Sequence, residues 1–196
     1  MTQLKIPSHV KILLLAFLAI TLFACSAQTA TVPSKDIYTD AVSQPNDLWQ
    51  RLRNGFALEP LHNKHIKRNE ISYTKNPKFL YRITKRSERY LFYIVEEVES
   101  RGMPSEMALV PLVESAFNPI AKSSSNAVGL WQFIPDTGKS FGLKQDGWLD
   151  ERQDVIAATH AALDYLQALN NKFDDWNLAL AAYNWGQGAV SRSQAK

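Results

Sequence analysis

Residues 108–117 read ALVPLVESAF, and nine of these ten residues are uncharged. The exception is Glu114, which has Leu112, Val113 and Phe117 as near neighbours. A Glu on a helix is usually a solvated surface residue, but these apolar neighbours favour partial desolvation of the carboxyl. Desolvation disfavours the charged form and raises the pKa. Because general-acid catalysis needs a carboxyl that stays protonated near neutral pH, we single out Glu114 as a candidate catalytic acid.

A second informative stretch, residues 129–137, reads GLWQFIPDT. Gly129 has no side chain and lets the backbone approach a ligand closely. Gln132 can both donate and accept hydrogen bonds, as the recognition of sugar hydroxyls or N-acetyl groups requires. These residue types predict a binding segment after the polar loop at 123–126.

The third stretch, residues 176–186, reads WNLALAAYNWG and predicts an Ala-rich helix that ends before Gly186. Near its end Tyr183 offers a ring and a hydroxyl, and Asn184 offers an amide. Each of the two, taken alone, is as readily an ordinary helix-end residue as a ligand contact. Tyr183 and Asn184 become candidate site residues because they occur together with the other two stretches.

The N-terminus has the pattern of a secretory signal segment. Lys5 and Lys11 lead into an apolar run of 13 residues at 12–24, which is the length of a signal-peptide core and short for a membrane span. The run ends in LFAC, and Cys25 is the only cysteine of the chain. This ending resembles the lipobox of bacterial lipoproteins, which implies cleavage before Cys25 and lipid attachment there. The alternative is an ordinary signal peptide with an incidental thiol. Ser26 is not the Asp that often retains lipoproteins at the inner membrane, so an outer-membrane anchor facing the periplasm is favoured.

Two segments separate the signal segment, 1–24, from the motif-bearing region. Residues 25–45 are rich in Ser, Thr, Ala and Gln and predict a flexible tether. Residues 46–76 predict an N-terminal helical appendage that begins with a short amphipathic helix. His62 and His65 have a spacing that suits a metal ion, but no Cys or carboxylate cluster accompanies them, so surface histidines are the favoured interpretation.

Apolar residues at helical spacing predict one long helix from Pro77 to about residue 101, the longest of the chain. Asn76 fits the N-cap, Pro77 the first helical position, and Gly102 the C-cap. The first half of this helix is strongly basic, which is either a solvated face or an attraction for an anionic polymer, such as cell-wall stem peptides or nucleic acid. The net charge of +3 is small and no nucleic-acid-binding motif is present, so we expect no nucleic-acid partner.

Two more helices are predicted around the motifs. One starts after Pro104, carries Glu114 near its end and stops at Asn118-Pro119. The other follows a capping box formed by Asp150 and Gln153. This second helix is expected to bury Val155, Ile156, Leu163, Leu166 and Leu169, with His160 as an ordinary helix residue.

Taken together, the three stretches closely resemble the lytic transglycosylases that share the goose-type lysozyme fold. The family pattern is Glu-Ser, then Gly-Leu-Trp/Met-Gln-Phe/Ile with a following Pro-x-Thr, then Ala-Tyr-Asn. Here the three parts begin at Glu114, Gly129 and Ala182, in that order. The resemblance extends from about residue 77 to the C-terminus and looks strongest to the membrane-bound D-type subfamily, whose members are also lipoproteins.

This resemblance implies an all-α, lysozyme-like (goose-type) catalytic domain at 77–196. It implies that Glu114 is the single catalytic acid and base. It further implies that five residues bind the substrate or position the catalytic carboxyl, namely Ser115, Gly129, Gln132, Tyr183 and Asn184. The substrate would be peptidoglycan glycan strands, and no metal or organic cofactor would take part.

The chain departs from the family at its end. Relatives usually continue with further helices and, in the D-type subfamily, with LysM glycan-binding modules, whereas this sequence stops 12 residues after Asn184. We therefore expect a domain that is C-terminally truncated relative to the family.

The carboxylates near the three motifs also indicate a reaction mechanism independently of the family resemblance. Glycoside hydrolases usually use two carboxylates, but near the motifs only Glu114 has apolar surroundings. One carboxylate suffices if the 6-hydroxyl of N-acetylmuramic acid attacks its own anomeric carbon, which yields a 1,6-anhydromuramyl end. Two alternatives stay open: a lysozyme-type hydrolase of the same bond, and a truncated, non-catalytic peptidoglycan-binding lipoprotein.

Overall fold

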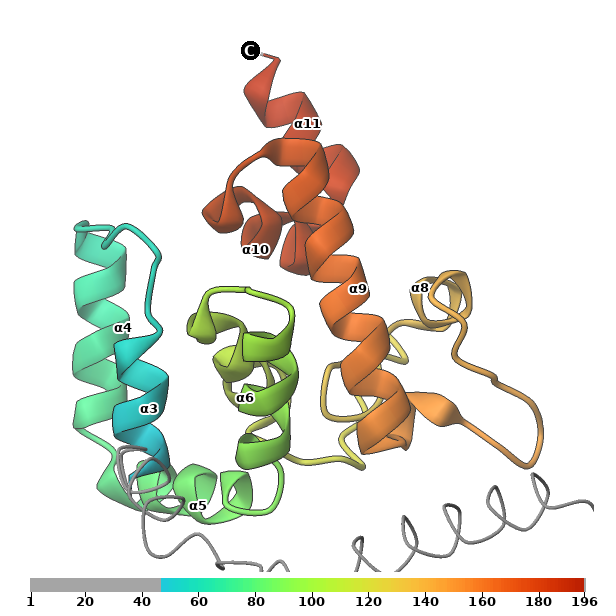
Figure 1. The fold of residues 1–196 in the computed structure, drawn as a ribbon, viewed down its shortest axis with the longest axis horizontal. Helices are drawn as coiled ribbons and strands as arrows, with labels where there is room; N and C mark the ends of the chain where they lie inside the picture. The colour runs from blue at the N-terminus through green and yellow to red at the C-terminus, as the bar shows by residue number, and fades with distance from the viewer. Residues whose placement is uncertain (1–46, 196) are drawn as a thin grey trace, which may run out of the picture. The chain divides into compact units, whose positions relative to one another are not determined.

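The computed structural model describes residues 47–195. The predicted signal segment, the tether and Cys25 lie outside the described residues. In the described part the elements are helical (Figure 1): α3 (Leu48–Asn54), α4 (Lys64–Thr74), α5 (Pro77–Ser87), α6 (Leu91–Ser100), η2 (Ser105–Leu109), α7 (Val110–Ser115), α8 (Pro135–Ser140), η3 (Glu151–Gln153), α9 (Val155–Phe173), α10 (Trp176–Trp185) and α11 (Gln187–Gln194). The prediction of an all-α domain is confirmed.

The core of residues 47–195 is built around α6 and α9. Helix α9 packs against α6 and α10, and α10 packs against α11, as Figure 1 shows for the orange and red helices. One cluster of buried residues includes Leu91 and Ile94 of α6 and Leu163 of α9. The loop residue Trp131 belongs to the same cluster, is fully buried and donates its indole N–H to the Thr159 hydroxyl at 3.0 Å. The loop at residues 126–134, which precedes α8 and which we call the motif loop, is therefore anchored in the core.

The predicted long helix from Pro77 is wrong in one respect, because it is divided into α5 and α6. Asn76 does cap α5 by accepting from the Phe79 N–H, and Pro77 is at the first turn. The division falls at Glu88–Tyr90, where the Ser87 hydroxyl donates to the Thr84 carbonyl and the Tyr90 N–H to the Ser87 carbonyl. No Pro or Gly marks this position. As a result of the division, the longest helix described is α9, with 19 residues, and not the predicted helix from Pro77.

Gly102 lies one position beyond the C-cap of α6, at φ +64°. The Gly102 N–H donates to the Glu99 carbonyl at 2.9 Å, and the Met103 N–H to the Val98 carbonyl at 3.1 Å. This is the Schellman arrangement, in which a left-handed residue closes the helix. The predicted helix end is thus found within one residue.

The helix that carries Glu114 is shorter than predicted. It begins as the 3₁₀ turn η2, continues as α7 and ends at Ser115 instead of at Asn118. Ala116 and Phe117 have φ of 51° and 54°, and the Phe117 N–H donates to the Pro111 carbonyl at 3.1 Å. Glu114 consequently lies in the last turn of α7, directly before a sharp change in chain direction.

The start of α9 also differs from the prediction. Asp154, not Asp150, is the N-cap of α9, and its carboxylate accepts from the Ala157 N–H. Asp150 is instead the N-cap of the preceding 3₁₀ turn η3, where its carboxylate accepts from the Arg152 backbone N–H at 3.2 Å and also from the Arg152 side chain. Of the residues expected to be buried in α9, Leu163, Leu166 and Leu169 are buried, Val155 is partly buried, and Ile156 is exposed, because alanines at 158, 161 and 162 form the packed face.

The first two described helices have side-chain caps at their starts. Asp47 caps α3, and Asn63 caps α4 by accepting from the N–H groups of His65 and Ile66. Leu52 of α3 is buried, whereas α4 has no buried residue. Within residues 47–195, none of the helices is long and apolar enough to span a membrane.

Candidate active site

The three motif stretches meet at one cavity of about 440 Å³. Glu114 from the end of α7 lines it, Gln132 comes from the loop before α8, and Tyr183 and Asn184 come from the end of α10. Residues far apart in the sequence are thus brought to one site. Among residues 47–195, no second Asp or Glu lines this cavity.

The carboxyl of Glu114 is partly buried, and this burial raises its pKa above the ordinary value. A side-chain hydrogen bond from Asn184 acts in the opposite direction, because it stabilises the charged form, but its effect is the smaller of the two. A carboxyl with a raised pKa can hold a proton for transfer, and the neighbouring amide can then stabilise the carboxylate that remains.

Tyr183 is held by its own hydrogen bond. The phenol O–H donates to the Trp131 carbonyl at 2.8 Å, and the ring lies 5.3 Å from that of Tyr165, centroid to centroid. Burial first, and then the nearby Glu114 charge, raise the pKa of Tyr183 well above its ordinary value. The phenol is therefore neutral and links the end of α10 to the motif loop.

Gln132 has a backbone φ of 54°, a conformation that is uncommon for a residue with a side chain. Its side-chain amide Nε2 donates to the carbonyls of Gly129 and Ala121, at 2.9 and 3.3 Å. Since both contacts use the nitrogen, the amide is fixed in orientation, and its carbonyl oxygen is the group suited to accept from a ligand.

Ser115 contributes to the site through hydrogen bonds between its hydroxyl and backbone groups of neighbouring segments. Its hydroxyl donates to the Leu130 carbonyl at 2.8 Å and accepts from the Asn118 N–H at 3.2 Å. These contacts fasten the end of α7 to the motif loop and so fix where Glu114 lies. Ser115 is not among the residues that line the cavity.

Gly129 does not line the cavity either. The group that closely approaches it is the Arg152 backbone carbonyl, not a ligand. A Cβ at this position would lie 1.8 Å from the Arg152 carbonyl oxygen, and the backbone has φ +87°. The glycine is thus required for packing of the motif loop against the segment before α9. A role in binding substrate stays a prediction.

Sequence reasoning missed Arg152. Its buried guanidinium donates to the carbonyls of Asn126 and Phe133, at 2.9 and 3.1 Å, and to the Asp150 carboxylate through Nε and Nη2. This side chain holds both ends of the motif loop. No local pattern marks Arg152, because its carbonyl partners lie 26 and 19 residues earlier and its own neighbours resemble an ordinary helix start.

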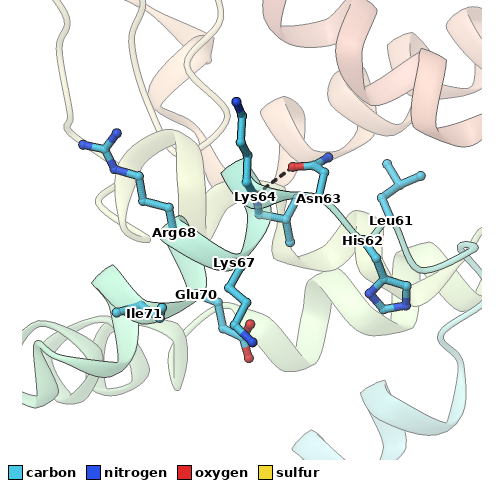
Figure 2. Close-up of a pocket in the computed structure, with 9 residues that line it drawn as sticks. Leu61, His62, Asn63, Lys64, Lys67, Arg68, Glu70 and Ile71 are labelled. Atoms are coloured by element: carbon cyan, nitrogen blue, oxygen red, sulfur yellow. Dashed lines mark hydrogen bonds between the residues drawn. The ribbon is translucent and has the colours of Figure 1, made fainter.

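A larger hollow of about 730 Å³ lies along α4 and the residues before it (Figure 2), and Glu114 is not among the residues that line it. The side chains that line it, such as Lys64 and Arg68, extend separately from one short segment and do not converge on a common point (Figure 2). His62 lines this hollow, but in the described part of the chain no group of three or more His, Cys, Asp or Glu residues is placed to hold a metal ion.

The chain is similar in sequence to a known protein family and to several named relatives. The family model described as Transglycosylase SLT domain matches residues 84–196. The chain is 42% identical over 154 residues to membrane-bound lytic murein transglycosylase D of Escherichia coli K12, a match that covers 78% of this chain and 34% of that protein. It is 30% identical over 155 residues to membrane-bound lytic murein transglycosylase C of Glaesserella parasuis, covering 72% and 42% of the two chains.

Among solved structures, an inactive mutant of the lytic transglycosylase Slt from Pseudomonas aeruginosa is 33% identical, over 50% of this chain and 17% of that chain, with a TM-score of 0.40. This chain spans about a third of the length of the E. coli relative.

Proposed function

Because this chain belongs to the Transglycosylase SLT domain family, we propose that it is a peptidoglycan lytic transglycosylase that acts in cell-wall turnover. It cleaves the β-1,4 bond between N-acetylmuramic acid and N-acetylglucosamine and leaves 1,6-anhydromuramyl ends. The observation that carries the proposal is the partly buried carboxyl of Glu114, with its raised pKa, in a cavity shared with Gln132, Tyr183 and Asn184.

In the first step, Glu114 acts as the general acid. Its carboxyl proton passes to the glycosidic oxygen as the bond from that oxygen to the muramyl anomeric carbon breaks, and N-acetylglucosamine leaves with the proton. The Asn184 amide stabilises the carboxylate that remains, since a hydrogen bond to a carboxylate favours its charged form.

In the second step, the same carboxylate acts as the base. It takes the proton of the muramyl 6-hydroxyl while that oxygen forms a bond to the anomeric carbon. Glu114 is thereby returned to its protonated form, and no water is consumed. The attack is intramolecular, and well-oriented reactions of this kind reach effective molarities on the order of 10⁵ M or more.

The other site residues have supporting roles in this proposal. Gln132 presents its amide oxygen to the sugar, because its nitrogen is held by backbone carbonyls. The hydroxyls of Ser115 and Tyr183 donate to backbone carbonyls of the motif loop and so fix the loop relative to the ends of α7 and α10. Gly129 allows this loop to pack closely on Arg152.

The organisation and location of the protein are further parts of the proposal. We infer a signal segment at 1–24, a lipid anchor at Cys25, a tether at 25–45, a helical appendage at 46–76 and the catalytic domain at 77–196. The anchor places the protein in the bacterial cell envelope, at the outer membrane facing the periplasm. Support comes from the lipobox-like sequence before Cys25 and from relatives that are named as membrane-bound.

The substitution Glu114→Gln tests the proposed function. It preserves the shape of the side chain and removes the transferable proton, so release of muropeptides from purified sacculi should fall by about 100- to 10,000-fold. Binding to sacculi and the helical circular dichroism signal should be retained. Activity close to that of the unmodified protein would contradict a catalytic role for Glu114, and loss of the helical signal would show that its role is structural.

A further inference from the structure

A second groove, of about 550 Å³, lies between α5 and the segment that follows α7. Helix α5 and the turn after it contribute four cationic side chains, Arg82, Lys85, Arg86 and Arg89. The segment at 117–120 forms the other wall. This groove is separate from the cavity that Glu114 lines, and the function derived above makes no use of it.

The groove is unusually basic for a chain with a net charge of only +3. Its four cations are exposed, and none of the described residues that line it is Asp or Glu. Lys85 is paired with Glu88 at 2.9 Å, and Arg82 lies over the Phe79 ring at 5.5 Å. Arg86 and Arg89 make no ion pair with any residue in 47–195, so their guanidinium groups are the ones placed to bind an anion.

Apolar surface accompanies the charge. Tyr81 and Ile120 line the groove and are 70% and 73% exposed. Large exposed apolar side chains beside guanidinium groups suit a ligand that has both carboxylates and short aliphatic parts. A peptide with several free carboxylates has this chemistry, since Arg binds carboxylates in a bidentate manner and the apolar side chains pack against the ligand's aliphatic groups.

The groove is close to the candidate active site along the chain. Phe117 lines the groove, and Glu114 lines the active-site cavity, only three residues earlier. Their α-carbons are therefore at most about 11 Å apart. A sugar bound with its glycosidic oxygen at Glu114 would bring any branch that it carries within reach of the groove.

We propose that this groove binds the carboxylates of the peptide branches attached to N-acetylmuramic acid, with Arg86 and Arg89 as the main contacts. The proposal rests on the proposed function for the identity of the glycan. In it, the groove makes the protein prefer strands that carry peptides over bare strands. An anionic membrane surface is the competing occupant, but the concave form of the groove and its position next to Glu114 favour a branch of the substrate.

The test compares binding to two ligands, glycan strands with intact peptide branches and the same strands after an amidase has removed the peptides. All proteins carry Glu114→Gln so that the strands are not cut. The groove variant adds Arg86→Gln and Arg89→Gln. The matched control adds Lys67→Gln and Arg68→Gln, which remove the same charge from the exposed helix α4 (Figure 2).

The protein with Arg86 and Arg89 intact should bind peptide-bearing strands about tenfold more tightly than bare strands, as two charge-assisted contacts would give. The groove variant should lose this preference and bind bare strands unchanged, while the control variant keeps the preference. Equal binding of both ligands by the intact protein, or an undiminished preference in the groove variant, would overturn the proposal.

Vesicles containing phosphatidylglycerol distinguish the membrane alternative. If the groove variant loses vesicle binding but keeps its preference for peptide-bearing strands, the groove serves a membrane and the proposal is wrong. Failure of the proposed function would be seen separately, as the absence of anhydromuramyl products from the protein with Glu114 intact, because the binding comparison does not depend on turnover.

Discussion

Glu114 is a carboxyl whose placement costs stability. Burial raises its folded-state pKa above the ordinary value of 4.5, so ionising it is harder in the folded protein than in the unfolded chain. This loss of stability is absent at pH values below the pKa of Glu114 in the unfolded chain. It develops as the pH rises from that pKa to the higher pKa of Glu114 in the folded protein.

The substitution Glu114→Gln should therefore stabilise the protein in a pH-dependent way. The stability of the variant relative to the unmodified protein should increase as the pH rises from acid towards neutral, and then level off above the folded pKa. Urea unfolding at a series of pH values measures this difference.

Asp146→Asn is the matched control with the opposite sign. The N–H groups of Trp148 and Leu149 lower the pKa of Asp146, so its carboxylate stabilises the fold above its unfolded pKa, and this contribution is lost as the pH falls. The Asn variant should become relatively less stable as the pH rises. A Glu114→Gln profile that runs parallel to the Asp146→Asn profile would mean that the pKa of Glu114 is not raised.

At the scale of elements, the motif loop is held against the start of α9 by close packing at Gly129. The substitution Gly129→Ala would place a Cβ 1.8 Å from the Arg152 carbonyl oxygen on a backbone with φ +87°. We expect it to reduce the free energy of unfolding by about 3 kcal/mol or more and to lower activity, because the loop carries Gln132.

Gly142→Ala separates the packing effect from backbone strain. Gly142 also has a positive φ, +84°, but nothing lies within 4 Å of its added Cβ. This control should cost only about 1–2 kcal/mol. If urea unfolding gives the two variants the same loss, the close approach to Arg152 does not contribute to stability.

Local signals in the sequence predicted the elements that depend on local interactions. The Asn76 cap, the Gly102 helix end and the Ala-rich helix that ends before Gly186 are all found in the structure. The three motif stretches also contribute Glu114, Gln132, Tyr183 and Asn184 to one cavity, and the binding of substrate by these residues stays a prediction.

Two features of the fold were not predicted: the break between α5 and α6, and the long-range contacts of Arg152. The break between α5 and α6 has no Pro or Gly at Glu88–Tyr90, and apolar residues continue at helical spacing across it. Asp150 does cap a helical turn, the short η3 and not α9, and it also binds the Arg152 side chain, whose other partners are carbonyls 26 and 19 residues earlier. Only the folded chain brings Arg152 and these carbonyls together, so these contacts do not follow from a local pattern.

At the scale of the whole molecule, the proposed lipid anchor determines where the catalytic domain acts. Cys25 lies outside the described residues, and its role rests on the lipobox-like sequence at 22–25. The substitution Cys25→Ala should move the protein from the membrane fraction to the soluble periplasmic fraction. Fractionation followed by immunoblotting measures this shift, and unchanged membrane partition would contradict the lipoprotein proposal.

The central claim is that Glu114 works alone and that the substrate supplies the nucleophile. A hydrolase must place a water on the anomeric carbon, and a second carboxylate normally activates or replaces that water. In the described residues Glu114 is the one carboxylate that lines the cavity. The identity of the product therefore decides between the two chemistries.

Mass spectrometry of muropeptides released from intact sacculi in ¹⁸O-labelled water measures this directly. A transglycosylase releases products that are lighter by one water than those of a lysozyme, contain no label at the new ends and do not change mass on treatment with borohydride. We predict this result. Incorporation of the label at the new muramyl ends, together with a mass gain on reduction, would show that hydrolysis is the reaction and that the single-carboxylate account is wrong.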